Sequence, residues 1–141
     1  MANTPRLSKA LVQLREQFDD SFPKRDRKSD GWLGDARHSA TVSDHNPDVN
    51  GWVRALDVDA DLDRNPESMA KIVNQIRKRA RKDGRLNYII FNGRIASRKS
   101  LWVWKKYRGI NPHRTHAHFS ALTTADRDNK FWNVPLLGGS Q

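Results

Sequence analysis

A β-hairpin pattern between residues 86 and 97 constrains the fold of this chain more than any other feature. Residues 86–91 read Leu-Asn-Tyr-Ile-Ile-Phe, a short run of the apolar, β-branched and aromatic side chains that favour strands. Asn92-Gly93 follows, and this dipeptide is the strongest short signal for a two-residue hairpin turn. Residues 94–97 then begin the return strand. The pattern predicts an antiparallel sheet.

Two segments have the apolar spacing of amphipathic helices. The first is expected over residues 5–18, because Thr4-Pro5 has the character of a helix N-cap and first helical residue. Its apolar positions are Leu7, Ala10, Leu11, Leu14 and Phe18. The second begins near Asn65-Pro66 and ends at Gly84, a natural stop for a helix. Its apolar stripe is Met69, Ile72, Val73, Ile76 and Ala80, and its opposite face is basic.

Further strands are expected on both sides of the hairpin. Residues 53–58 and 116–122 are β-prone, and residues 101–107 are expected to form a short strand or an aromatic wall of a cleft. Trp102, Trp104 and Tyr107 supply the aromatic rings there, and core packing is the alternative use for them. The element order predicts an α+β fold in which a small antiparallel sheet carries the helices on one side.

The length of 141 residues, 36% of them hydrophobic, suits one domain with one modest core. We expect a single domain over residues 1–141, with its core between residues 5 and 122. The tail, residues 123–141, is expected to be irregular and held to the core by Phe131, Trp132 and Leu136.

The residues that are absent narrow the class of protein. The chain has no cysteine, which excludes disulfides, thiolate metal ligands and a cysteine nucleophile. It has neither an apolar run of signal-peptide length nor the ~20 apolar residues of a membrane helix, so no membrane insertion is expected. The net charge of +10 favours polyanionic partners. Nucleic acid and anionic wall polymers both fit that charge, and so does a merely solubilising surface.

Histidine and aspartate side chains gather near two of the predicted strands. Alternate side chains of a strand share a face, so His116 and His118 point to the same side. Asp57 faces the same cleft if the two strands are neighbours, and His45 lies in the loop that precedes it. Zinc accepts imidazole nitrogen and carboxylate oxygen, and a catalytic zinc uses three protein ligands. These residues are therefore candidates for a hydrolytic zinc site in a cleft on the sheet; ordinary polar residues are the alternative.

The spacing of these residues resembles that of a family of zinc peptidases. Ser43-x-His45, Ala55-x-Asp57 and His116-x-His118 are similar to motifs of the superfamily that includes D-Ala-D-Ala carboxypeptidases and dipeptidases, lysostaphin-type enzymes and the hedgehog signalling domain. The closer resemblance is to M15-like peptidoglycan peptidases of phages and actinobacteria. It covers roughly residues 5–122 and includes Phe22-Pro23-x-Arg25, Ser29-Asp30-Gly31, Gly34-Asp35-Ala36-x-His38, Ser43-Asp44-His45-Asn46-Pro47, Arg54-Ala55-Leu56-Asp57, Tyr88-Ile89-Ile90-Phe91-Asn92 and Asn111-Pro112-His113.

The resemblance implies a role for each matched residue. It makes His45, Asp57 and His118 the ligands of one Zn²⁺, and it makes His116 a catalytic residue beside the metal. Two departures from the family pattern bear on this. Asp57 lies twelve residues after His45, further than is common, and residues 46–51 have the composition of a turn that absorbs the extra length. Thr115 stands where many relatives carry an acidic general base, and His116 is the favoured replacement.

Four further residues are candidates for substrate binding: Arg37, His38, Ser43 and His113. Arg37 would bind a substrate carboxylate through paired hydrogen bonds, and an ordinary surface arginine is the alternative. His38 is a cleft residue or a plain loop histidine, and His113 contacts substrate or caps a turn. Ser43 lacks the Gly-x-Ser-x-Gly context of a nucleophile.

The leading prediction is a zinc metallopeptidase that hydrolyses the stem or cross-link peptides of bacterial peptidoglycan, as a phage endolysin does. Such a protein would be made in the host cytoplasm without a signal peptide, would act on the cell wall after release, and is expected to be a monomer. A metal-dependent nuclease is one alternative, although no histidine lies between His45 and His113 to complete such a site. A non-catalytic, zinc-containing wall-binding module is the other.

Overall fold

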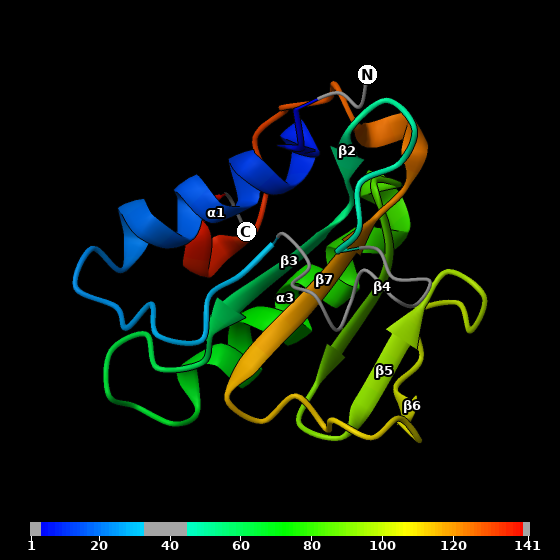
Figure 1. The fold of residues 1–141 in the computed structure, drawn as a ribbon. Helices are drawn as coiled ribbons and strands as arrows, with labels where there is room; N and C mark the ends of the chain where they lie inside the picture. The colour runs from blue at the N-terminus through cyan, green and yellow to red at the C-terminus, as the bar shows by residue number, and fades with distance from the viewer. Residues whose placement is uncertain (1–3, 33–44, 140–141) are drawn as a thin grey trace.

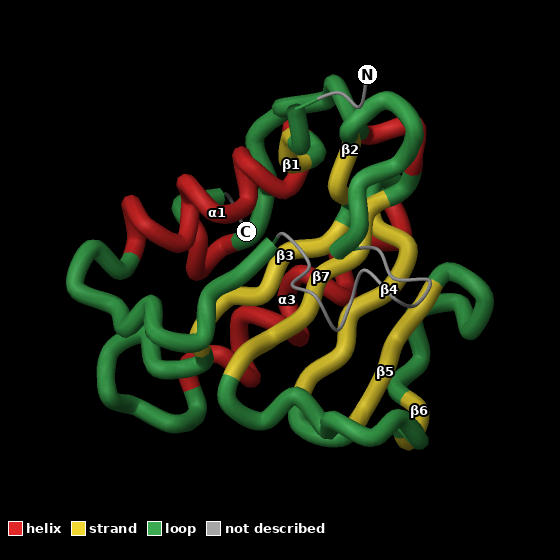
Figure 2. The backbone as a smooth tube through the Cα atoms, viewed as in Figure 1, coloured by secondary structure: helices red, strands yellow, loops and turns green. Residues whose placement is uncertain are grey.

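The body of the protein is a five-stranded antiparallel sheet (Figure 1). The computed structural model describes residues 4–32 and 45–139. The strands follow the spatial order β3-β7-β4-β5-β6, with bounds Ala55–Asp59, His116–Ala121, Leu86–Phe91, Arg94–Ser97 and Lys105–Lys106. Figure 2 shows the helices outside this sheet, with α3 behind it and α1 on the β3 side. The α+β class and the antiparallel sheet are therefore confirmed.

The predicted hairpin is confirmed residue by residue. Phe91 of β4 pairs with Arg94 of β5, so Asn92 and Gly93 are the two turn residues. Both have positive φ, 51° and 77°, as a type I′ turn requires. The aromatic segment after the hairpin contributes little to the sheet, because only Lys105 and Lys106 pair with β5.

The register of β3 against β7 decides which residues share a face. Asp57 lies opposite His118, and Asp59 lies opposite His116. The alternate residues of these strands, such as Leu56 and Phe119, face the other way and are fully or almost fully buried. One face of the sheet is thus apolar, and the other carries the histidines and aspartates.

Both helices pack against the apolar face. The helices α1 (Lys9–Ser21) and α3 (Ser68–Asp83) contribute buried residues to one hydrophobic cluster that also contains Leu56 and Phe119. Gly84 ends α3 in the left-handed conformation, with φ 80°, as the sequence predicted. None of the helices within the described residues has the length and apolar character needed to cross a bilayer.

The first helix begins four residues later than the sequence predicted, at Lys9 instead of Pro5. Residues Arg6–Leu7 form the short strand β1, which pairs in parallel with β2 (Trp52–Val53). The backbone N–H groups of Arg6 and Ser8 donate hydrogen bonds of 2.8 Å to the carbonyls of Gly51 and Val53. These bonds hold the segment extended, so a tertiary contact overrides the local helix signal.

The tail after β7 has two 3-10 turns, Thr123–Ala125 and Pro135–Leu137. Trp132 is fully buried and its indole N–H donates to the Ala10 carbonyl at 2.8 Å. The expectation that Phe131 and Leu136 also hold the tail is wrong, because they are 51% and 43% exposed. Leu137 takes that position instead, since the 3-10 turn carries it to the inner side.

Replacement of the buried tail tryptophan is expected to destabilise the fold. Trp132→Ala should lower the free energy of unfolding by about 3–5 kcal/mol, because it leaves a cavity under α1 and removes a buried hydrogen bond. Phe131→Ala, the adjacent exposed aromatic, should change it by less than about 1 kcal/mol. Urea unfolding of the two variants checks this, and equal losses would show that Trp132 is not a core residue.

Candidate metal centre

Three side chains converge on the polar face of the sheet: His45, Asp57 and His118. One potential ligand atom from each lies within 4.8 Å of the other two. Asp57 Oδ1 is 2.9 Å from His118 Nδ1, and Asp57 Oδ2 is 3.3 Å from His45 Nε2. Two ligands of one tetrahedral zinc are separated by about 3.3 Å, since each bond is about 2.0–2.1 Å. The spacing of the three side chains therefore suits a metal ion.

The hydrogen bond of His45 fixes which of its nitrogens faces the group. His45 Nδ1 is 2.9 Å from the Trp32 carbonyl oxygen, which only accepts, so Nδ1 carries the hydrogen. In the neutral ring, the lone pair of Nε2 then points at the Asp57 carboxylate. Two electron-rich atoms 3.3 Å apart repel unless a cation lies between them. The arrangement thus favours a positive charge at this point, either a proton or a metal ion.

His118 is enclosed by rings and keeps one nitrogen unused. Tyr88 stacks on it with centroids 5.5 Å apart, and His45 meets it edge-on at 5.1 Å. Its Nδ1 contacts Asp57, whereas its Nε2 is buried and has no hydrogen-bond partner in the part of the chain that the structure describes. A buried polar nitrogen left in this way has a free position for a further ligand or proton.

The segment of residues 25–32, which we call the strap, positions two of these three residues. Gly31 and Asp57 exchange backbone hydrogen bonds of 3.1 and 2.7 Å, so the strap lies along the free edge of β3. The next residue, Trp32, supplies the carbonyl that orients His45. The strap therefore connects the backbone of one candidate ligand to the side chain of another.

A buried arginine holds the strap in place. Arg25 is 4% exposed and forms two hydrogen bonds to Asp30, of 2.9 and 2.7 Å, and further contacts with Asp19 of α1. Asp30 in turn accepts the backbone N–H of Asp59 at 2.7 Å. Paired Arg–carboxylate bonds of this kind fix orientation as well as distance.

Two more histidines border the group. His116 Nε2 is 3.8 Å from Asp57 Oδ2, and the Thr115 hydroxyl is 3.4 Å from His116 Nδ1. The His113 ring lies 4.9 Å from that of His116 and 5.5 Å from that of His118. His113 has a positive φ of 58°, and its Nδ1 donates to the Asn111 carbonyl at 2.7 Å. Its Nε2 is therefore the acceptor nitrogen in the neutral ring.

The charge states follow from burial and from mutual contacts. Burial alone would raise the pKa of Asp57, but its interactions with His118 and His45 outweigh it and hold that pKa well below its usual range. Burial lowers the pKa of His113 to about 4, helped by the nearby His118 and His116. Burial also lowers the pKa of His116, although Asp57 opposes this. At neutral pH the ionised Asp57 carboxylate thus lies beside two histidines, His113 and His116, whose lowered pKa values favour the neutral imidazole.

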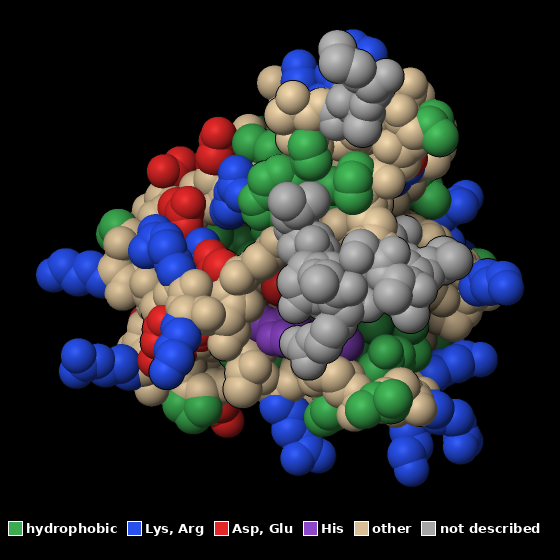
Figure 3. Space-filling view, in the orientation of Figure 1, with side chains coloured by type: hydrophobic (Ala, Val, Ile, Leu, Met, Phe, Trp, Pro, Cys, Tyr) green, Lys and Arg blue, Asp and Glu red, His purple; other side chains and the backbone are tan. Residues whose placement is uncertain are grey.

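The structure brings together the residues that the sequence predicted as ligands. His45, Asp57 and His118 form one buried group that can hold a metal ion, and His113 and His116 lie beside it. Histidine side chains are visible on this face of the molecule in Figure 3. The predicted substrate residues Arg37, His38 and Ser43 lie outside the described residues. Trp102 is 5% exposed and belongs to the core, so it does not line an open cleft.

Three contributors to the site were not predicted. The Trp32 carbonyl, the Arg25–Asp30 pair and the Tyr88 ring each position a candidate ligand without being one. Only Tyr88 has a usable sequence signal, because it lies two residues from Ile90 and so shares its face on the strand that pairs with β7, where Ile90 lies opposite His118. The other two depend on a loop whose path follows from tertiary contacts.

Comparison of this chain with family models, with curated proteins and with solved structures finds no match. A functional assignment therefore depends on the residues and geometry of the site itself.

Loss of the buried arginine is expected to loosen the strap. Arg25→Met should lower the free energy of unfolding by about 3 kcal/mol, because it leaves Asp30 and Asp19 without their buried partner. The matched control is Arg27→Met, which removes an exposed arginine 3.0 Å from the same Asp19 and should cost less than about 1 kcal/mol. Urea unfolding compares them, and a similar loss for both would contradict the role given to Arg25.

Proposed function

We propose that this protein is a zinc-dependent peptidase that hydrolyses peptide bonds of bacterial peptidoglycan. The observation that carries the proposal is the convergence of His45 Nε2 and His118 on the Asp57 carboxylate in one buried group with the spacing of metal ligands. The resemblance of the sequence to M15-like peptidases supports the same three residues as ligands. Peptidoglycan as substrate, and action as an endolysin, come from that resemblance.

The donor set favours zinc over harder cations. It contains two imidazole nitrogens and one carboxylate oxygen, whereas Mg²⁺ and Ca²⁺ prefer oxygen ligands alone. Structural zinc sites are usually rich in cysteine, and this chain has none. A bound Zn²⁺ would polarise the scissile carbonyl and make water acidic enough to ionise near pH 7.

His116 is the residue we assign to proton transfer. Its depressed pKa keeps the imidazole neutral, so it can accept a proton at neutral pH and later give one to the leaving amine. Its Nε2 faces the Asp57 carboxylate, and Thr115 contacts the opposite nitrogen. Thr115 itself occupies the position of the usual acidic base but has no titratable group, which is why the role passes to the next residue.

His113 is suited to hold the substrate. With Nδ1 committed to Asn111, its Nε2 is an acceptor that an amide N–H of a peptide can use. Its ring lies against His116, so a peptide bound there would place its bonds close to the proposed proton acceptor. Arg37, His38 and Ser43 remain predicted substrate contacts.

Metal content tests the ligand set. The purified, unchelated protein is expected to hold one zinc per chain, and His118→Ala should lose it because a catalytic site has only three protein ligands. His113→Ala removes a neighbouring histidine that is not a ligand and should keep the metal. Elemental analysis decides this, and either a metal-free wild type or full occupancy in His118→Ala would contradict the assignment.

The proton-transfer role predicts a variant that binds metal but turns over slowly. His116→Ala should retain zinc and lose about 10²–10⁴-fold in kcat, the usual contribution of a positioned acid–base group. Release of new amino groups from purified wall measures this rate. A near wild-type rate would place the base elsewhere, with His113 the next residue to change.

The same proteins distinguish a peptidase from a nuclease. Incubation with supercoiled plasmid and either zinc or magnesium is expected to leave the plasmid intact. Nicking that disappears in both His116→Ala and His118→Ala would replace the peptidase proposal with a nuclease. Intact zinc with no cleavage of wall or plasmid would instead indicate a non-catalytic wall-binding module.

A further inference from the structure

The charge of this protein is distributed unevenly along the chain. Residues 84–125 contain no aspartate or glutamate but eight lysines and arginines. All of these except Arg85 are exposed. They lie largely on the hairpin β4–β5 and the segment that follows it, the lower right region of Figure 3, where Lys and Arg side chains dominate. A surface of this kind attracts polyanions over a long range.

A hollow of about 460 Å³ lies within this basic region, between α3 and the hairpin. We call it the Trp104 groove, and its lining includes Lys71, Asn74, Arg94 and Trp104. Arg94 lies with its guanidinium carbon 4.8 Å from the centre of the Trp104 ring. Lys71 and Arg94 are exposed, and neither has an acidic partner within residues 4–32 and 45–139. The lining also contains Glu67, the N-cap residue of α3.

A second arginine beside the ring is structural. Arg77 also lies near Trp104, at 5.6 Å, but it donates to the Trp102 carbonyl at 2.7 Å and to Asn74 Oδ1. These bonds keep Arg77 in place, so it supports the indole ring. Arg94 and Lys71 are the cations of the groove that remain able to meet a ligand.

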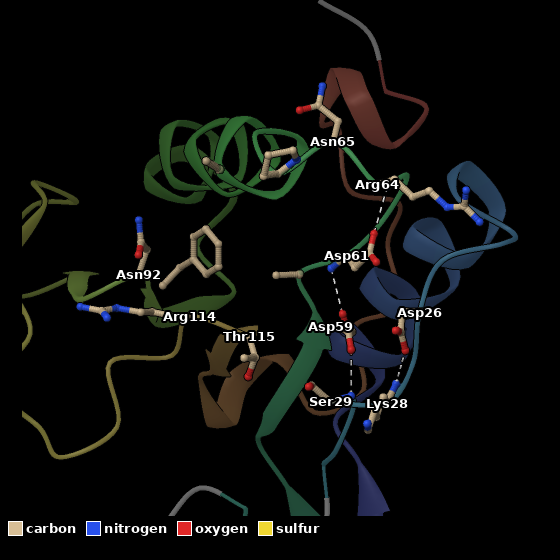
Figure 4. A pocket seen from close by; sticks show the side chains of 14 residues that line it. Asp26, Lys28, Ser29, Asp59, Asp61, Arg64, Asn65, Asn92, Arg114 and Thr115 are labelled. Atoms are coloured by element: carbon tan, nitrogen blue, oxygen red, sulfur yellow. Dashed lines mark hydrogen bonds between the residues drawn. The ribbon is translucent and has the colours of Figure 1, made fainter.

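The Trp104 groove leads towards the candidate metal centre. A second hollow, of about 630 Å³, shares Ala70, Phe91 and Asn92 with it and extends to Thr115. Figure 4 shows this second hollow, with Asn92 and Arg114 on one side and Thr115 and Asp59 further along. The Thr115 hydroxyl is 3.4 Å from His116 Nδ1. The two hollows thus connect Trp104 to Thr115, the residue next to the proposed proton acceptor, and the far side of the second hollow also carries Asp26, Asp59 and Asp61.

We infer that the Trp104 groove binds an acidic glycan, with its carboxylate or phosphate groups at Lys71 and at Arg94, whose guanidinium lies over the indole ring. Guanidinium groups bind such anions through charged hydrogen bonds, and cation–π attraction to the indole helps to hold Arg94 in the groove. The choice of a wall glycan as the polymer depends on the proposed function; the binding site does not. Binding of the polymer here would hold its peptide near the metal centre and supply binding energy remote from the reaction.

The groove fits a glycan better than a nucleic acid. Single-stranded nucleic acids stack successive bases on several aromatic side chains along a basic groove. Here the neighbouring Trp102 is buried, and Phe91, the other aromatic side chain of the lining, is partly buried against the hydrophobic core. One ring flanked by cations suits a repeating acidic sugar.

Sedimentation with purified cell wall tests this inference without relying on cleavage. Arg94→Glu is expected to weaken wall binding by about tenfold or more, since it replaces an attractive contact with a repulsive one. Trp104→Ala should weaken it similarly. Trp104 also packs partly against the core, so its replacement can affect folding as well as binding. The surface variant Arg94→Glu is therefore the decisive one. The matched control is Arg127→Glu, an exposed arginine 5.7 Å from the Trp52 ring, which should bind wall as the wild type does.

Further measurements identify the bound group and distinguish the glycan-binding proposal from the peptidase proposal. Walls stripped of phosphate polymers distinguish phosphate from carboxylate as the bound group. Equal binding by Arg94→Glu and Arg127→Glu overturns the inference, and so does a loss of binding to single-stranded DNA with wall binding unchanged. Hydrolysis of a small soluble peptide by Arg94→Glu should equal that of the wild type. If no protein cleaves the peptide but wall binding still depends on Arg94, the peptidase proposal fails and the glycan site stands.

Discussion

The pairing of β3 with β7 is the constraint on which the rest of the site depends. It sets Asp57 opposite His118, within 2.9 Å, and it sends Leu56 and Phe119 to the helices on the other face. A shift of one residue would reverse every side chain and place the carboxylate in the core. The packing of α1 and α3 on the apolar face therefore stabilises the same register that assembles the candidate metal centre.

Local signals predicted those parts of the fold that local forces determine. Asn92-Gly93 requires positive φ at both positions, and the hairpin forms there as expected. The predicted start of α1 was wrong because the backbone N–H groups of Arg6 and Ser8 donate hydrogen bonds to the carbonyls of Gly51 and Val53, which are distant in sequence. The prediction for the tail was wrong for a similar reason: the 3-10 turn at Pro135–Leu137 decides that Leu137 and not Leu136 is buried, and hydrophobicity does not distinguish the two leucines.

The candidate site likewise has residues that the sequence could predict and residues that it could not. Ligand chemistry and strand alternation marked His45, Asp57, His116 and His118 as candidates, and the resemblance to the peptidase family selected His118 over His116 as the ligand. The residues that orient them were not predictable, since a backbone carbonyl such as that of Trp32 carries no sequence signal. Arg25 is a further example, because nothing in the sequence distinguishes a buried arginine from an exposed one. Its burial follows only from the fold, which places Asp19 and Asp30 beside it.

The strap has a consequence for how a peptide can be recognised. Its pairing with Asp57, and the bond from the Asp59 N–H to Asp30, use the outward backbone groups at this end of the edge strand β3. A substrate peptide therefore cannot add to the sheet there as an extra strand, the mode that demands an extended chain of uniform chirality. Recognition must pass through side chains and loops. Such contacts do not require the regular geometry of an all-L strand and, under the proposed function, would admit the mixed D- and L-residues of a wall peptide.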